Sequence, residues 1–359
     1  MNRDKNFEIR ILKIMLLVYI ILAILLAGLN YSYANQSVSS IAKFITWFWH
    51  FYENWVKTLF IIIGSFLTLR IIGSLQQSTM RKRNLAGFMV ATLVVHIVGP
   101  ILLNNTELYF FTMPLPWTTT PLQLLYPQSS FYLSRYPIWG VAGISTALIF
   151  YVLVSIVVIF GTLLFGRRWQ CSTLCLFNGF ASEVFAPAFP LIGKKISITR
   201  GMLKIFYFVR WFFLILALIF TFWWILFLSG FQFFSNPNLM SQLEIYKYLG
   251  VELLMMMFFW IAFLGRGYCY YCPLGTVLSL LSKLSGQKII TNQAKCIQCN
   301  QCNIACPMSI DIKSMAKLGQ PVTNLRCVGC GHCIDICPTK TLGYSTIFLD
   351  WLYNLFKRR

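Results

Sequence analysis

Eight cysteines near the carboxyl end have the spacing that binds iron–sulfur clusters. They form two runs, CIQCNQCNIACP at 296–307 and CVGCGHCIDICP at 327–338. Each run is C-x2-C-x2-C-x3-C-P, in which three thiolates bind one [4Fe–4S] cube and the fourth cysteine binds the neighbouring cube. We therefore predict two clusters, the first held by Cys296, Cys299, Cys302 and Cys337, and the second by Cys327, Cys330, Cys333 and Cys306.

Zinc and disulfide bonds are the alternative uses of these cysteines. Structural zinc sites usually take two C-x2-C pairs, not four thiols within each run. Structural disulfides are rare in the cytoplasm, where we expect this part of the chain to lie. Both alternatives are therefore disfavoured, and the cofactors that we expect are two [4Fe–4S] clusters.

The chain has twelve cysteines, and the other four lie in two similar motifs that each follow an apolar run. The motifs are GRRWQCSTLCL at 166–176 and GRGYCYYCPLGT at 265–276, called here the two Gly-Arg motifs. We expect both at the cytoplasmic surface, where their arginines would lower the thiol pKa values and favour metal binding. Three uses remain open, namely a shared iron–sulfur or other metal site, a redox-active dithiol, and reduced thiols that only pack. The four residues are Cys171, Cys175, Cys269 and Cys272.

The composition is that of a membrane protein. Hydrophobic residues make up 58% of the chain and charged residues only 11%, against about one quarter charged in soluble domains. About 20 apolar residues cross a bilayer as a helix, and six stretches approach or exceed that length. These are 11–29, 55–75, 85–103, 143–165, 210–230 and the shorter 249–265. A basic start precedes the first stretch, but this apolar run is longer than that of a secretory signal, so we expect an uncleaved anchor.

Basic residues predict the orientation. The amino end, the second and fourth connections and the segment after the sixth span hold 26 of the 30 Lys and Arg residues. Because basic segments stay in the cytoplasm, both termini are expected there, in a bacterial cytoplasmic (inner) membrane. The net charge of +20 is spread over four segments, which disfavours nucleic acid as a partner. Membrane lipid is the expected partner, together with redox proteins.

These patterns divide the chain into three parts. We expect a transmembrane domain at 1–286, an α+β ferredoxin-like domain at 287–345 and an amphipathic surface tail at 346–359. The outer loop at 104–137 is expected to cap the membrane interface, with Trp117 at headgroup depth, or to dock an extracytoplasmic redox partner. The three histidines are too few and too scattered for a transmembrane haem chain. A quinone is a further cofactor considered, with His96 and Glu252 as candidate contacts and Arg167 or Arg266 as alternatives.

The whole layout resembles the polyferredoxin-like membrane proteins of the NapH, MauN and NosR group, most closely the NapH type. The resemblance covers roughly residues 55–345 and implies the membrane subunit of a quinol dehydrogenase that feeds electrons toward a periplasmic reductase. The family usually has C-x3-C-P in both membrane motifs. Here Leu176 stands where the first proline would be, and the second motif, with Cys269, Cys272 and Pro273, is one residue shorter.

Two classes of function follow. In the first, the protein carries electrons between a quinone pool or redox partner and the clusters, within a respiratory reductase pathway. In the second, the clusters supply electrons to reduce a metal such as copper during maturation or regulation of an oxidase or reductase. A transporter is disfavoured, because acidic residues within spans and broken helix pairs are scarce. No catalytic residue is predicted, and whether the chain is itself an enzyme is left open.

Overall fold

The computed structural model describes residues 2–33, 40–73, 78–193, 198–231, 236–263 and 265–357. Lys194, Lys195, Arg358 and Arg359, four of the basic residues used to predict the orientation, lie outside this part of the chain. Within it, six helical segments are long and apolar enough to cross a membrane, which confirms the predicted fold class. Each begins earlier in the chain than the apolar stretch that predicted it, because helix ends are more polar than the bilayer core, and three end two or three residues before it. The segments are Lys5–Asn30, Ser40–Gly73, Thr79–Leu103, Ser130–Phe165, Arg200–Leu228 and Pro237–Ala262.

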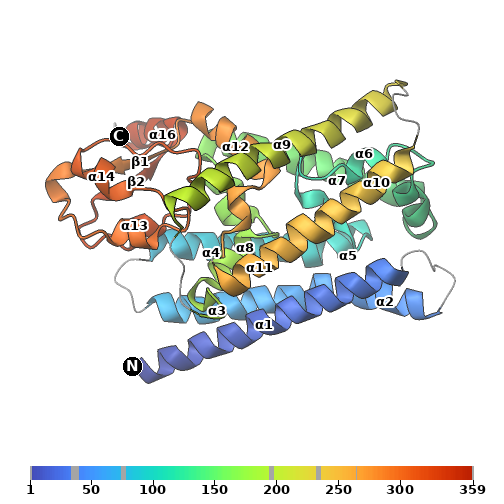
Figure 1. The fold of residues 1–359 in the computed structure, drawn as a ribbon, viewed down its shortest axis with the longest axis horizontal. Helices are drawn as coiled ribbons and strands as arrows, with labels where there is room; N and C mark the ends of the chain where they lie inside the picture. Colours follow the sequence, from blue (N-terminus) through green and yellow to red (C-terminus); the bar gives the residue numbers. More distant parts are fainter. Residues whose placement is uncertain are drawn as a thin grey trace.

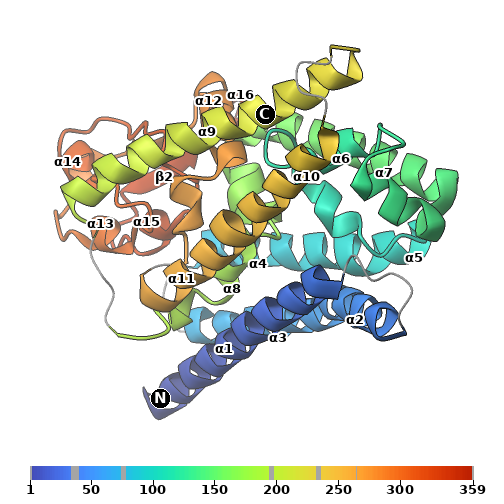
Figure 2. The same ribbon diagram turned by 45° about the vertical axis from the view of Figure 1, so that its right-hand side comes forward.

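Several of these spans are composite helices. The first and fourth spans lie in α1 (Asn2–Tyr33) and α7 (Ser130–Phe165), and the fifth is α9 (Arg200–Leu228). The second joins α2 (Ser40–Phe51) and α3 (Lys57–Gly73) through a π-helical turn, and the third joins α4 (Thr79–Thr92) and α5 (Gly99–Leu103) similarly. The sixth consists of α10 (Pro237–Tyr246), a π-helical stretch and α11 (Met255–Ala262). Helix α1 packs against α2 and α3 (Figure 2).

The outside of the bundle is apolar. Ile149, Leu153 and Phe160 of α7 are each more than half exposed, as are Phe208 and Phe222 of α9. Large apolar side chains are exposed in this density only where a non-aqueous phase covers them. These faces are therefore the surfaces that contact lipid.

Lys57 and Lys247, two of the four basic residues outside the basic segments that predicted the orientation, lie inside spans. Lys57 is buried and pairs with Glu53 at 2.8 Å, and Lys247 pairs with Glu252 at 3.3 Å. Glu252 is only 3% exposed, so its carboxylate is covered by the protein. A buried carboxylate needs a cationic partner. Lys247, which precedes Glu252 by five residues, supplies it.

The connection between the third and fourth spans folds back into the bundle. It contains a 3-10 turn at Leu108–Thr112 and the short helix α6 (Thr120–Gln123). Trp117 is only 4% exposed, and its indole N–H donates to the Tyr268 hydroxyl at 2.9 Å. The expectation that Trp117 lies at headgroup depth is therefore wrong, because its polar atom is satisfied by another part of the chain instead of by the interface.

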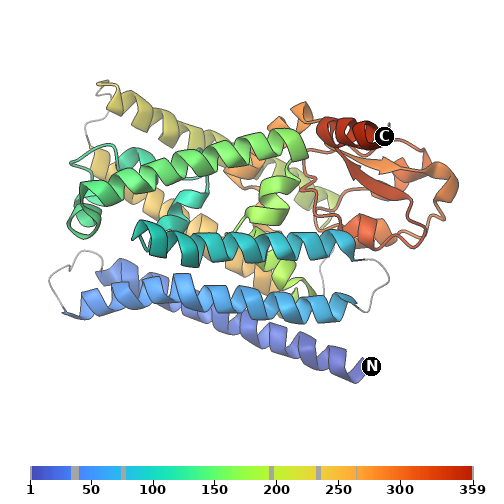
Figure 3. The ribbon, with the colours of Figure 1, turned by 180° about the vertical axis from the view of Figure 1, so that it is seen from behind.

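The carboxyl-terminal part is a small α+β domain at one end of the bundle (Figures 1 and 3). Strands β1 (Lys288–Thr291) and β2 (Leu342–Ser345) pair antiparallel, with Lys288 opposite Ser345. Between them lie the short helices α13 (Gln301–Ala305), α14 (Ile312–Lys317) and α15 (His332–Asp335). Helix α12 (Pro273–Leu284) joins the bundle to this domain and packs against α7 and α9.

The last helix, α16 (Ile347–Lys357), follows β2. Its Phe348 ring contacts Phe165 at the end of α7, with ring centroids 5.5 Å apart. Ile347, Trp351 and Leu355 are about half exposed or more. An exposed apolar face of this kind fits the predicted surface tail, which remains a prediction.

Candidate metal centres

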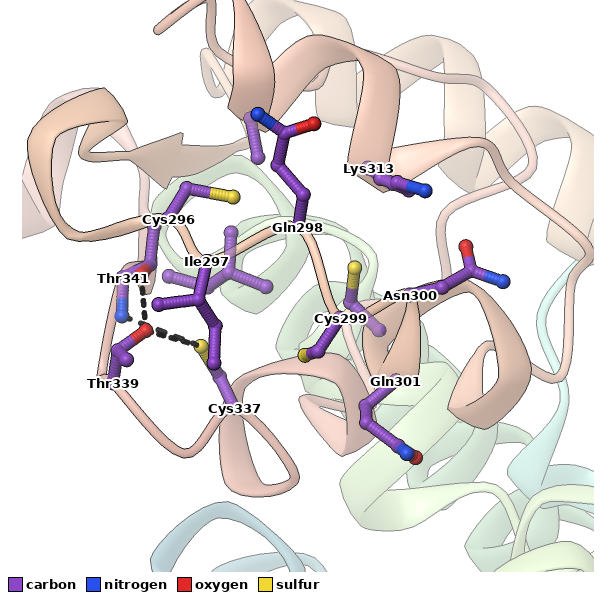
Figure 4. Close-up of a pocket in the computed structure, with 13 residues that line it drawn as sticks. Cys296, Ile297, Gln298, Cys299, Asn300, Gln301, Lys313, Cys337, Thr339 and Thr341 are labelled. Atoms are coloured by element: carbon purple, nitrogen blue, oxygen red, sulfur yellow. Dashed lines mark hydrogen bonds between the residues drawn. The ribbon is translucent and has the colours of Figure 1, made fainter.

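The four cysteines predicted for the first cluster line one cavity, which holds about 360 Å³ of empty space. Figure 4 shows Cys296, Cys299 and Cys337 around it. Asn300, with φ of +65°, lets the chain enter α13 directly after Cys299. The Thr341 amide donates to the Cys337 sulfur at 3.4 Å, a contact that suits a thiolate ligand. The donors and the space both fit a [4Fe–4S] cluster.

The cysteines predicted for the second cluster are also neighbours. Burial raises the pKa of Cys333, and the nearby thiols of Cys330, Cys327 and Cys306 raise this pKa further. Cys330 and Cys333 are only 8% and 7% exposed. Four thiolates in a buried site repel one another, and a cationic cluster core that binds them removes this repulsion. The arrangement therefore fits the second predicted set.

Side chains of the bundle hold the backbone of the second run. Asn84 of α4 donates to the Cys330 carbonyl at 2.8 Å. Ser172, from the first Gly-Arg motif, donates to the Val328 carbonyl at 2.8 Å. The Asp335 carboxylate in turn accepts from the first amides of α4, those of Met80 and Arg81. An acidic group at a helix amino end is favourable, so α4 and α15 are positioned against each other.

A buried ionic cluster lies beneath this contact. Glu183 of α8 (Gly179–Val184) is fully buried, pairs with Arg266 at 2.5 Å and lies 2.9 Å from His332. Burial would raise the pKa of Glu183, but His332 and Arg266 hold this pKa below its ordinary value. An ionised carboxylate thus links the second Gly-Arg motif to the second cluster run. No motif marked Glu183 in the sequence, because a lone Glu between apolar residues has no signature spacing.

The four remaining cysteines surround a second cavity, of about 350 Å³. Its lining includes Met113 from the connection at 104–137 and Arg167 from the first Gly-Arg motif. Burial raises the pKa of Cys272, and the thiols of Cys171, Cys175 and Cys269 raise it further. The two motifs therefore meet, as expected, and present their four thiols to one space.

The depth and the pKa values of this site differ from the expectation. The Tyr271 hydroxyl donates to the Val251 carbonyl at 3.2 Å, and Val251 lies eleven residues before the end of α11 at Ala262. That separation is about 16 Å along a helix, so the second motif folds back into the bundle and does not stay at its rim. In this dry interior, burial and, to a lesser extent, the nearby Cys171 thiol raise the pKa of Cys175 to about 11. The expected lowering is therefore wrong for Cys175, and likewise for Cys171 and Cys272.

Several hydrogen bonds point at the sulfurs of this site. Arg167 Nε donates to the Cys171 sulfur at 3.3 Å, and Asn178 Nδ2 donates to the Cys269 sulfur at 3.2 Å. The amide of Gly275 donates to the Cys272 sulfur, also at 3.3 Å. Gly275 leaves room for Arg167, because an added Cβ would lie 2.6 Å from its guanidinium.

Two of the quinone candidates, His96 and Glu252, do not line either cavity described above, whereas Arg167 lines the second one. His96 is 1% exposed and its ring stacks on Tyr109, with centroids 5.9 Å apart. Glu252 is occupied by Lys247. Neither side chain faces lipid, so the structure adds nothing in favour of a quinone at either residue.

Comparison with known proteins agrees with the cluster domain. Residues 288–338 match the family model of a 4Fe–4S dicluster domain. An uncharacterized protein of Methanocaldococcus jannaschii is 29% identical over 108 residues, which is 30% of this chain and 42% of that protein. The YccM protein of Escherichia coli, named for electron transport, is 29% identical over 110 residues, covering 29% of this chain and 30% of its own length.

A third relative is the ferredoxin-type protein NapH of Haemophilus influenzae. It is 30% identical over 105 residues, which is 28% of this chain and 37% of the relative. The chain thus aligns with less than half of each of these proteins. No solved structure matches it. The comparisons show a 4Fe–4S dicluster domain in a chain that is similar to a protein named for electron transport and to a ferredoxin-type protein.

Proposed function

We propose that this protein is a membrane-anchored electron carrier that exchanges electrons between a redox partner and the quinone pool through two [4Fe–4S] clusters. The first cluster would be held by Cys296, Cys299, Cys302 and Cys337, and the second by Cys327, Cys330, Cys333 and Cys306. Each cluster supplies one-electron transfer when bound. The protein would serve in a respiratory reductase pathway, as a quinol dehydrogenase component.

The observation that carries the proposal is the unequal exposure of the two cysteine runs. Cys299 is exposed, and the neighbouring Ile297 is 63% exposed. Cys330 and Cys333 are buried where the domain meets the bundle. Electron transfer requires short distances at both ends of a relay. The first run therefore faces a soluble partner, while the second faces the membrane domain.

The bundle keeps the second run in place and dry. Asn84 and Ser172 of the bundle each donate to a carbonyl of that run at 2.8 Å. Gln287, at the start of the ferredoxin-like domain, donates to a third carbonyl at 3.1 Å. Satisfied buried polar groups fix one geometry and exclude water. A domain that merely hung from the membrane by a linker would not need these contacts.

The proposed location rests on the distribution of basic residues, and the proposed role rests on the names of similar proteins. The bias of basic residues supports a cytoplasmic location for both termini and for the clusters, in the inner membrane of a bacterium. The names of the YccM and NapH relatives point to electron transport. Both lines favour the carrier over the maturation role.

The test is electron exchange by the full chain in lipid nanodiscs, prepared without oxygen. Protein reduced with dithionite and freed of excess reductant is mixed with a short-chain quinone, and cluster absorbance is followed. We expect the clusters to be reoxidised. The variant Asn84→Ala, which frees the Cys330 carbonyl, should slow this step, while Lys317→Ala, exposed on α14 and outside the lining of the first cavity, should not. Reoxidation by Cu(II) but not by quinone would overturn the proposal in favour of metal reduction.

A further inference from the structure

We infer that Cys171, Cys175, Cys269 and Cys272 bind a third [4Fe–4S] cluster inside the helical bundle. The inference rests on the proposed function only for the source and the acceptor of its electrons. The cavity brings together two pairs of thiols that lie about a hundred residues apart in the chain.

The cavity is similar in size to the one lined by the first set of ferredoxin cysteines. It holds about 350 Å³ of empty space, against about 360 Å³ for the cavity lined by the first set of ferredoxin cysteines. A single zinc ion, with Zn–S bonds of about 2.3 Å, would require thiols about 3.8 Å apart. Among the described residues, the one group of three ligand atoms found within 4.8 Å of one another is Glu183, Cys330 and His332. The four thiols are therefore spread too widely for one ion, as are the ferredoxin cysteines.

The buried positive charges beside the cavity would be stabilised by an anion within it. Arg167 and Arg210 are only 1% and 6% exposed, and their guanidinium groups share one acceptor, the Leu325 carbonyl, at 3.3 and 3.5 Å. In the described part of the chain, neither forms an ion pair with a carboxylate, whereas Arg266 has Glu183. Two buried like charges at one carbonyl are unfavourable unless a negative group lies beside them. Four thiolates on a [4Fe–4S] core, with an overall charge of about −2, supply it.

The donors are aimed at sulfur. Arg167, Asn178 and the Gly275 amide each donate to a different cysteine of the four, at 3.2 to 3.3 Å. Hydrogen bonds to ligating sulfurs stabilise iron–sulfur clusters and set their potentials. A redox dithiol requires two sulfurs, and thiols that only pack do not require a buried guanidinium and a side-chain amide directed at them. The four-sulfur arrangement is therefore best explained by one cluster.

The site lies where it could exchange electrons with the second ferredoxin cluster. Leu325, which both arginines contact, lies two residues before Cys327 of the second ferredoxin set. Met113 and Tyr268 line the cavity from the other side, and Tyr268 bonds Trp117 of the connection at 104–137. A one-electron carrier here would extend the relay from the ferredoxin domain into the bundle, accepting one electron from the second cluster and passing one electron to a quinone of the pool, which takes up two electrons and two protons in all to become a quinol.

The test is iron and acid-labile sulfide content of the full chain, purified without oxygen, with Mössbauer spectra of the same samples. At four irons per cube, wild type should hold about twelve irons. Cys171→Ser with Cys175→Ser should lower this by one third, to about eight, and so should Cys269→Ser with Cys272→Ser. The quadruple variant should be no lower. Thr173→Ser, between the first pair but outside the cavity lining, should keep about twelve.

The outcomes separate the two proposals. Unchanged ferredoxin spectra and a single gel-filtration peak in lipid nanodiscs will show that each variant is folded. About eight irons in wild type and in both double variants would overturn the third cluster and leave the two-cluster relay standing. One zinc or copper ion that is lost in both double variants would also overturn it. Iron near zero in reconstituted wild type would instead overturn the two-cluster relay itself.

Discussion

Glu183 of the bundle and His332 of the second cluster run are joined by a contact of 2.9 Å between Oε2 and Nε2. The other carboxylate oxygen of Glu183 binds Arg266 at 2.5 Å. One side chain therefore ties together the ferredoxin domain, helix α8 and the second Gly-Arg motif. This makes the ferredoxin domain and the bundle one mechanical unit at the place where electrons would cross between them.

Removing the charge of Glu183 should loosen this unit. Glu183→Gln leaves the guanidinium of Arg266 buried without a counter-charge, a change that costs about 3–5 kcal/mol of folding free energy. We expect the cluster absorbance to be lost at a lower temperature during thermal denaturation. The measurement is the midpoint of that loss in detergent, under nitrogen.

Asp350→Asn is the matched control. Asp350 pairs with Lys288 at 3.0 Å, but its side chain is 43% exposed, so its loss should cost less than about 1 kcal/mol. Equal midpoints for the two variants would mean that Glu183 does not hold the domain to the bundle.

Single substitutions should separate the two ferredoxin clusters. Cys302→Ser and Cys337→Ser change opposite ends of the first predicted set, and both should alter the same electron paramagnetic resonance signal. Cys306→Ser and Cys333→Ser should alter the other one. The sequence neighbours Cys302 and Cys306 thus belong to different clusters. If these two instead changed one common signal, the crossed assignment would be wrong.

The parts predicted well from sequence were those set by local spacing. The C-x2-C-x2-C-x3-C-P runs indicated which cysteines should share a cavity, and Cys337 does line the same cavity as Cys296. Spans were recognisable because a bilayer imposes a length and an apolar composition. Both kinds of information are carried by residues close together in the chain.

The depth of the Gly-Arg motifs could not be predicted in this way. It depends on the hydrogen bond of Tyr271 with Val251 and on that of Trp117 with Tyr268, which lies 151 residues away. Hydropathy treats each segment alone, so an apolar stretch followed by Gly-Arg looks like the end of a span. For the same reason, the sequence could not predict which groups surround the charge of Arg167, because its neighbours come from separate segments.

Labelling in intact cells should report the orientation. Gln128, exposed in the connection at 104–137, and Lys357, at the end of α16, are each replaced by cysteine. A membrane-impermeant maleimide should label Gln128→Cys in intact cells and Lys357→Cys only after permeabilisation, because basic residues keep the carboxyl end inside. Labelling of Lys357→Cys in intact cells would reverse the proposed electron route.

The bond between Trp117 and Tyr268 should couple the outer connection to the four-cysteine cavity. Tyr268→Phe leaves the buried Trp117 N–H without its acceptor, which costs about 1–3 kcal/mol. Trp117→Phe removes the donor and some packing as well. Because both changes remove the same hydrogen bond, the double variant should be less destabilised than the two single effects added together, by about 1 kcal/mol.

Thermal denaturation in detergent, followed by circular dichroism, measures all three variants. Tyr126→Phe serves as the control, because its hydroxyl bonds Gln128 at an exposed position and its loss should change stability by less than about 0.5 kcal/mol. The iron content of Tyr268→Phe is measured on the same samples. If the two single effects simply add, Trp117 and Tyr268 act independently, and the connection at 104–137 covers the cavity without supporting it.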